Sequence, residues 1–223
     1  TPSAYSFNQD AGFSIIKYTG NSTSGAKIAH GLGVKPDVMI VKATNAAYEW
    51  PFYHSSLGAT KLIQLQSTAA ASTSSVAWNN TEPDSVNFTV QANNRTNTGS
   101  VYVGYMFAEK QGYSKFGSWI GTGNADGAFV YTGFKPAFVL VKSAGGITEW
   151  FITDDKRPGY NANYRINPNI MDAEATAASA NYCDLLSNGF KVRYNDVSGE
   201  EQIYMAFAEN PFVTSTGVPA TAR

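Results

Sequence analysis

The sequence predicts an all-β protein made of two tandem, homologous β-sandwich repeats of jelly-roll type that pack closely together. Three observations predict this fold class. One stretch of sequence occurs twice, the composition is typical of β-proteins, and short apolar runs alternate with turn signals. The chain of 223 residues is long enough for two domains of about 100 residues each.

The repeat is clearest around a Lys-Pro turn. The segment GVKPDVMIVK at 33–42 matches GFKPAFVLVK at 133–142, with Gly, Lys, Pro, Val and Lys at identical positions. Two shorter matches recur at the same spacing, Glu49-Trp50 with Glu149-Trp150 and Phe107-Ala108-Glu109 with Phe207-Ala208-Glu209. Conserved spacing between several matches indicates an internal duplication.

Upstream of the turn, the best sequence match aligns Phe13 with Phe116 and Thr19 with Thr122, which requires a longer loop in the first copy. The matches divide the chain into four parts: a lead-in segment at 1–11, a first repeat at 12–113, a second repeat at 114–212 and a C-terminal tail at 213–223. No linker rich in Pro, Gly or Ser separates the repeats, so we expect them to pack closely.

The strands are predicted from apolar runs bounded by Gly, Pro and Asn. VMIVK and FVLVK follow the Lys-Pro turns, and VYVGYMFAE and QIYMAFAE are apolar on both faces, which is typical of central, buried strands. The other strands expected in the first repeat are at 13–19, 26–30, 48–54, 61–65, 75–78 and 86–91. The segment MDAEATAASAN at 171–181 predicts either a short helix or a loop.

Composition and charge exclude several classes of protein. Charged residues make up 15% of the chain, the net charge is −1 and no basic run is present, so we expect no nucleic-acid partner. No apolar stretch has the length of a transmembrane helix, so we expect no membrane insertion. The single cysteine, Cys183, excludes an internal disulfide and a cysteine-cluster zinc site, and we expect it to be a small buried hydrophobe.

The search for catalytic residues predicts that the protein is not an enzyme and needs no metal or cofactor. His30 and His54 occur only in the first copy, without the sequence context of a nucleophile, so structural roles are expected. Two glutamate positions recur in both copies, Glu49 with Glu149 and Glu109 with Glu209, which favours a role in the fold over glycoside hydrolysis. The mixed-charge segment 154–157 is interpreted as a solvated turn.

Binding residues are expected where the two copies diverge, because the shared residues serve the fold. Trp50 and Trp150 recur in both copies and are therefore interpreted as residues of the core or of its edge, and not as ligand platforms. A divergent segment of the second copy alternates aromatic and amide side chains, which suit the faces and hydroxyls of a sugar but also occur in ordinary polar loops. The candidate ligand-binding residues are Tyr160, Asn163 and Tyr164.

Several longer segments resemble a known phage module. These are AGFSIIKYTGN, HGLGVKPDVMIVK, YEWPFYHSSLGATK, EKQGYSKFGSWIGTGNADGAFVYTGFKPAFVLVK, LLSNGFKVRYN and IYMAFAENPF. Together they resemble a duplicated β-rich module of tail-fibre-like and virion-associated proteins of tailed bacteriophages, notably marine and cyanobacterial phages. The resemblance covers nearly all of the chain. It implies a location on the surface of the virion, other virion proteins as partners and a homo-oligomer, with a trimer as the expected form.

Three functions are compatible with these observations. The first is a tail-fibre-like or decoration component that attaches the virion to a host-surface glycan. The second is a purely structural capsid or tail decoration protein with no host ligand. The third is a polysaccharide depolymerase, which would need two carboxylates facing each other across a cleft. The absence of a catalytic motif favours the first two.

Overall fold

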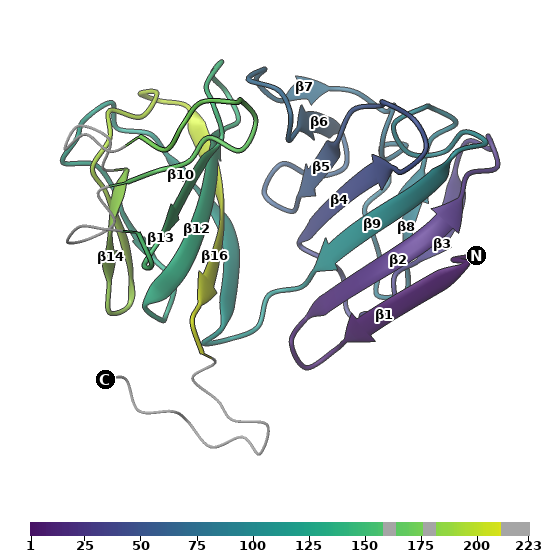
Figure 1. The fold of residues 1–223 in the computed structure, drawn as a ribbon, viewed down its shortest axis with the longest axis horizontal. Coiled ribbons are helices and arrows are strands. Elements are labelled where there is room, and N and C mark those ends of the chain that lie inside the picture. Colours follow the sequence, from purple (N-terminus) through teal and green to yellow (C-terminus); the bar gives the residue numbers. More distant parts are fainter. Residues whose placement is uncertain (158–163, 176–181, 211–223) are drawn as a thin grey trace. The chain divides into compact units, whose positions relative to one another are not determined.

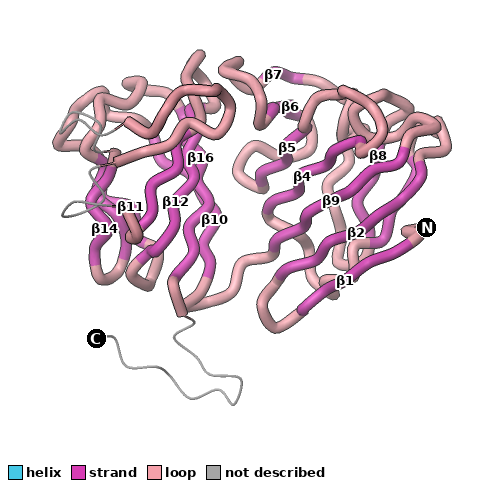
Figure 2. Tube along the Cα trace, in the orientation of Figure 1, coloured by secondary structure: helices cyan, strands magenta, loops and turns pink. Residues whose placement is uncertain are grey.

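The structure, a computed structural model, describes residues 1–157, 164–175 and 182–210 (Figure 1). The chain forms two compact units. The first comprises Thr1–Ser67 and Ala71–Glu109, and the second comprises Thr68–Ala70 and the chain from Lys110 onward. The described residues form strands and loops without any helix (Figure 2), which confirms the all-β class. Accordingly, these residues include no helix that could span a membrane.

The first unit contains a seven-stranded antiparallel sheet and a separate two-stranded ribbon. In spatial order, the sheet consists of β1 (Ala4–Asn8), β2 (Phe13–Thr19), β9 (Val101–Phe107), β4 (Val38–Ala43), β5 (Pro51–His54), β6 (Lys61–Gln64) and β7 (Ser72–Thr73). The ribbon pairs β3 (Ala26–Ala29) with β8 (Asn87–Val90).

The core of the first unit draws side chains from both the sheet and the ribbon. Alternate residues of β2 are buried, as expected for a strand with one face on the core. Tyr18 of β2 stacks on Tyr102 of β9, with ring centroids 5.2 Å apart, and meets Phe88 of β8 edge to face. Trp78 lies in the same cluster and is fully buried. Aromatic packing therefore joins the two sheets.

The second unit contains a four-stranded and a three-stranded antiparallel sheet. The larger sheet has the order β10 (Ser114–Ile120), β16 (Glu201–Ala208), β12 (Pro136–Ser143) and β13 (Phe151–Asp154). The smaller has the order β11 (Phe129–Tyr131), β15 (Gly189–Val192) and β14 (Cys183–Leu186). Phe190 of β15 packs edge to face on Tyr204 of β16, so here too the core takes side chains from both sheets.

The strands predicted to be central are central. β9 lies between β2 and β4, and β16 lies between β10 and β12. The strands after the Lys-Pro turns, β4 and β12, each have a neighbour on both sides. The runs that would be apolar on both faces of a strand therefore correctly indicated strands with a hydrogen-bonded neighbour on each side.

Two strand predictions need correction. The segment 75–78 is a turn: the backbone N–H of Asn79 donates to the carbonyl of Ser75, and that of Thr81 donates to the carbonyl of Trp78. Val76, Ala77 and Trp78 are apolar because the turn packs into the core, which is a tertiary effect. The strand expected at 48–54 begins only at Pro51, after a loop.

The strand register also corrects the alignment of the two copies. Phe13 lies opposite Phe107 in the first unit, whereas Ser114 lies opposite Phe207 in the second. Phe13 therefore corresponds to Ser114 by register, and not to Phe116. The sequence match was wrong by two residues because it followed the identity of a side chain instead of its place in the ladder.

The two repeated tryptophans lie just before equivalent strands. Trp150 precedes β13 and is 1% exposed, as expected of a core residue. Trp50 precedes β5 and is half-buried, with the ammonium of Lys42 5.7 Å from the centre of its ring. Both contribute to packing around the strand after the repeated loop.

Cys183 is completely buried in the core of the second unit, as predicted. Burial in an apolar environment raises the pKa of its thiol to about 12. We therefore expect no reaction of the folded protein with a thiol reagent at pH 8, and stoichiometric reaction after denaturation. Rapid labelling of the native protein would show that Cys183 is accessible.

Candidate ligand-binding site

The first strand, β1, forms an exposed edge of the seven-stranded sheet. Its residues, Ala4–Asn8, are exposed, and β2 is its only neighbour in the sheet. The turn into β2 is closed locally, since the side-chain oxygen of Asn8 accepts a hydrogen bond from the backbone N–H of Ala11 at 3.0 Å. Gly12 then adopts a φ of 65°, which favours glycine. Local contacts thus hold β1 against β2.

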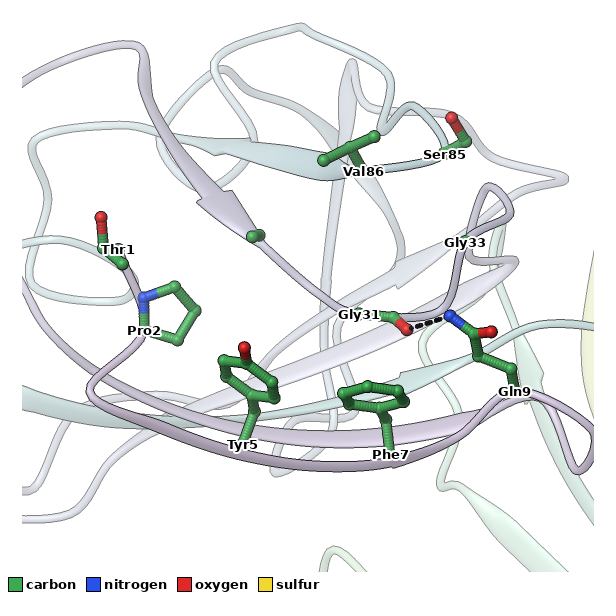
Figure 3. A pocket seen from close by; sticks show the side chains of 10 residues that line it. Thr1, Pro2, Tyr5, Phe7, Gln9, Gly31, Gly33, Ser85 and Val86 are labelled. Atoms are coloured by element: carbon green, nitrogen blue, oxygen red, sulfur yellow. Dashed lines mark hydrogen bonds between the residues drawn. The ribbon is translucent and has the colours of Figure 1, made fainter.

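Side chains at alternate positions of β1 lie on one face of the strand. Tyr5 and Phe7 lie side by side with ring centroids 5.6 Å apart and an interplanar angle of 29° (Figure 3). Tyr5 is 60% exposed and Phe7 is 46% exposed, so both rings present a large area to solvent. Gln9 follows in the same alternation. We call Tyr5 and Phe7 the aromatic platform.

Glycine residues allow the loop after β3 to approach the platform. A Cβ atom at Gly31 would lie 3.0 Å from the ring of Phe7, and Gly31 has a φ of +77°. The side-chain amide of Gln9 donates to the carbonyl of Gly31 at 2.9 Å (Figure 3). The loop is therefore tied to β1 at a distance that a larger residue would not permit.

A buried histidine positions the two loops that face β1. One ring nitrogen of His30 accepts the backbone N–H of Leu32, and the other donates to the carbonyl of Asp84. This arrangement requires the neutral form, and burial lowers the pKa of His30, consistent with that form. His30 thus links the loop after β3 to the loop before β8. Its contacts agree with the structural role expected from the sequence.

The loop before β8 provides the opposite wall. The carboxylate of Asp84 accepts the backbone N–H groups of Val86 and Asn87, each at 2.7 Å. These hydrogen bonds shape the turn that presents Ser85 and Val86 to the cavity. Val86 is 58% exposed and faces the aromatic platform across the opening (Figure 3).

These segments enclose a cavity of about 390 Å³ in the first unit. It is lined by Thr1, Pro2, Tyr5, Phe7, Gln9, Ala29, Gly31, Gly33, Ser85 and Val86. The volume lies in the range of small-ligand sites, and the lining combines apolar surface with a few neutral polar groups. Such a site can stack an apolar face of a ligand and hydrogen-bond to its edge. It contains no arrangement of acid, base and nucleophile among these described residues.

None of the described residues that the sequence predicted for ligand binding lines this cavity. Tyr160 and Asn163 lie outside the described residues. Tyr164 is half-buried in the second unit and does not line the cavity. The aromatic platform lies within residues 1–11, which were interpreted as a lead-in segment and not as a binding segment. The alternation of Tyr5, Phe7 and Gln9 in a segment without a counterpart in the second copy was the available signal.

Other candidate residues make contacts of a structural kind. Glu49 forms an ion pair with Arg95 at 2.8 Å, and Glu209 forms one with Lys156 at 2.7 Å. A ring nitrogen of His54 accepts the backbone N–H of Ser56. Within the described ranges, no group of three or more His, Cys, Asp or Glu residues could hold a metal ion.

Ion pairs between side chains hold part of the mixed-charge loop after β13, so only part of this loop is a solvated turn. Arg157 forms ion pairs with Asp154 and Glu174, and its own side chain is 19% exposed. Lys156, in contrast, is 69% exposed. One half of the loop is therefore anchored to another segment of the second unit, and the other half is solvated.

Comparison with known proteins identifies a family. A family model described as a domain of unknown function (DUF7483) matches residues 1–211. No curated protein and no solved structure matches the chain.

Proposed function

The chain belongs to the DUF7483 family, and we propose that it is a surface component of a phage virion that attaches to a host-surface glycan through the β1 cavity. The observation that carries the proposal is the aromatic platform, Tyr5 and Phe7, exposed at the wall of a cavity. Adjacent exposed aromatic rings at the wall of a cavity, unlike a single exposed ring, are a feature of ligand and partner sites. Stacked rings beside neutral polar groups suit the alternating apolar faces and hydroxyl edges of sugars.

The proposal includes the fold. We propose that the two units are tandem β-sandwich repeats that arose by duplication. The order β2-β9-β4-β5 in the first unit has the same chain sequence and pairing as β10-β16-β12-β13 in the second. In the first unit, β3 pairs with β8, and in the second, β11 pairs with β15 in the same position along the chain.

Detailed contacts also support duplication. The backbone N–H of Gly20 donates to the carbonyl of Ser100, and that of Gly121 donates to the carbonyl of Glu200. A Cβ atom added to Gly20 would lie 1.7 Å from a backbone oxygen of another segment. A Cβ atom added to Gly121 would lie 2.2 Å from such an oxygen. In each unit the same close approach requires glycine. The β1 strand and its cavity belong to the first unit, so binding would be a property added to a duplicated scaffold.

Weak binding at one cavity would be sufficient on a virion. Several copies of a chain that engage a cell surface together bind more tightly than one copy, without any new contact. A homo-oligomer, with a trimer as the expected form, and assembly with other virion proteins are therefore part of the proposal.

A second function is favoured by the same exposed edge. β1 has one neighbour in the sheet, and its aromatic side chains are exposed, which are also features of a surface that mates with another subunit. In this alternative the protein is a structural decoration component without a host ligand. The platform would then contribute to assembly, and its loss would change the oligomeric state.

The test is binding of the chain, multimerised on beads, to an array of bacterial surface glycans. We expect saturable binding that falls about tenfold for each of Tyr5→Ala and Phe7→Ala, because each ring contributes stacking area. Tyr131→Ala is the matched control, since Tyr131 is 64% exposed on β11 and lies outside the cavity. Binding that survives both cavity variants would place the site elsewhere.

Absence of binding to any glycan, with an oligomer that dissociates in Phe7→Ala, would replace attachment by the structural alternative. Size-exclusion chromatography with light scattering on the same four proteins measures that outcome. Circular dichroism of each variant shows whether the fold is retained.

A further inference from the structure

We infer that the β1 cavity selects a neutral saccharide and holds two adjacent sugar rings on the aromatic platform. The inference rests on the proposed attachment function and names the class of glycan. It is carried by three features of the cavity: the charge of its lining, the hydrogen-bonding groups it offers and the arrangement of its rings.

Charge is the first feature. None of the ten described residues that line the cavity has a charged side chain, and the charged group that this chain adds to the lining is the main-chain ammonium of Thr1. An acidic sugar, such as a uronic or sialic acid, needs a cation or several N–H donors to compensate for its loss of water. No lysine or arginine in the lining can supply that compensation.

Charged side chains in the flanking loops are already compensated. Lys35 forms an ion pair with Glu82 at 2.9 Å. The carboxylate of Asp84, beside Ser85, accepts two backbone N–H groups, which lower its pKa and keep it ionised. Lys27 of β3 acts on the same carboxylate. Lys35 and Lys27 therefore already act on carboxylates of the protein, so an anionic ligand would have to compete with Glu82 and Asp84 for them.

The available hydrogen-bonding groups are neutral. Gln9 uses one amide hydrogen on the carbonyl of Gly31, which leaves a second hydrogen and the amide oxygen for a ligand. The hydroxyls of Tyr5 and Ser85 can donate or accept. Groups that donate and accept at the same time match sugar hydroxyls, which do the same.

The arrangement of the rings sets the length of the ligand. Tyr5 and Phe7 are separated by 5.6 Å and are inclined by 29°, so together they form one gently bent strip and not two separate sites. This separation is comparable to that of consecutive pyranose rings in a saccharide chain. The cavity is open to solvent and has a volume of about 390 Å³, near the lower end of small-ligand sites, and its two platform rings offer stacking surface for two sugar rings.

The experiment compares matched neutral and carboxylated oligosaccharides of the same length on an array, with the full chain multimerised on beads. We expect binding of the neutral series at least tenfold tighter than binding of the acidic series. Gln9→Lys places a cation in the cavity and is expected to reverse or abolish that preference. Tyr131→Lys is the matched control, because it adds the same charge on the exposed surface of the second unit.

The outcomes separate this inference from the proposed function. Tighter binding of the acidic series, lost in Phe7→Ala, would overturn the neutral selectivity and leave attachment through the cavity in place. Binding to neither series, or to any other glycan on the array, would reject both. An equal change of preference in Gln9→Lys and Tyr131→Lys would show that net charge, and not the cavity, sets the selectivity.

Discussion

Replacing Trp78 by alanine is expected to lower the free energy of unfolding of the first unit by about 3–5 kcal/mol. The indole is fully buried and meets Tyr53 and Phe88 edge to face, with ring centroids 5.9 and 6.5 Å away. Its removal leaves a cavity that these two rings cannot fill without moving. Because domains are stable by only about 5–15 kcal/mol, this is a large fraction of the total.

Equilibrium unfolding in urea, followed by circular dichroism, measures the loss. Trp78→Phe is the matched control, since it keeps an aromatic ring in the same place and removes less volume; its cost should be clearly smaller. Phe88 lies on β8, directly after the loop that contains Ser85 and Val86, so Trp78→Ala should also weaken ligand binding. A loss below 1 kcal/mol would show that the core of the first unit does not depend on Trp78.

The central strands could be predicted from sequence because their signal is local. In β4 and β12 the Lys-Pro dipeptide is followed by an unbroken apolar run, and both edges of these strands are paired with neighbouring strands. The pattern occurs twice in the sequence, and a central strand follows it at both places. The strand predicted at 75–78 was wrong for the opposite reason. The local sequence resembles a strand, but its apolar residues form a turn that packs against distant strands.

The candidate site could not be predicted in full because it depends on contacts far apart in the sequence. His30 and Asp84, which hold two of its walls together, are separated by 54 positions. The Gln9 side chain reaches Gly31 across 22 positions. A single sequence shows which side chains alternate along β1, but it does not show which loops face them. The expectation that binding residues lie in divergent segments also covers residues 1–11, which have no counterpart in the second unit.

One buried lysine is expected to add about 2 kcal/mol to the stability of the second unit between pH 7 and pH 9.5, and ionisation of the Cys183 thiol in the unfolded state is expected to remove about 1 kcal/mol of that gain. Lys142 is completely buried, and burial lowers the pKa of its ammonium to about 8, against the opposing effect of Glu149. At pH 7 the folded and unfolded states both carry the proton, and the folded state bears the cost of burying the charge. Above pH 8 the folded state releases the proton, whereas the unfolded state keeps it up to its ordinary pKa of 10.5. The unfolded state then binds more protons, so the free energy of unfolding rises with pH.

Urea unfolding of the wild type and of Lys142→Met at several pH values tests this prediction, and the pH-dependent gain should disappear in the variant. The series stops at pH 9.5 because burial raises the pKa values of Tyr18 and Tyr182, whose ionisation in the unfolded state lowers stability above pH 10. The Lys142 ammonium also donates to the carbonyls of Ser143 and Gly146, so methionine should loosen the loop after β12. An undiminished pH-dependent gain in Lys142→Met would assign the effect to another group. A flat profile in the wild type would mean that these carbonyls hold the charged form strongly enough to offset its burial.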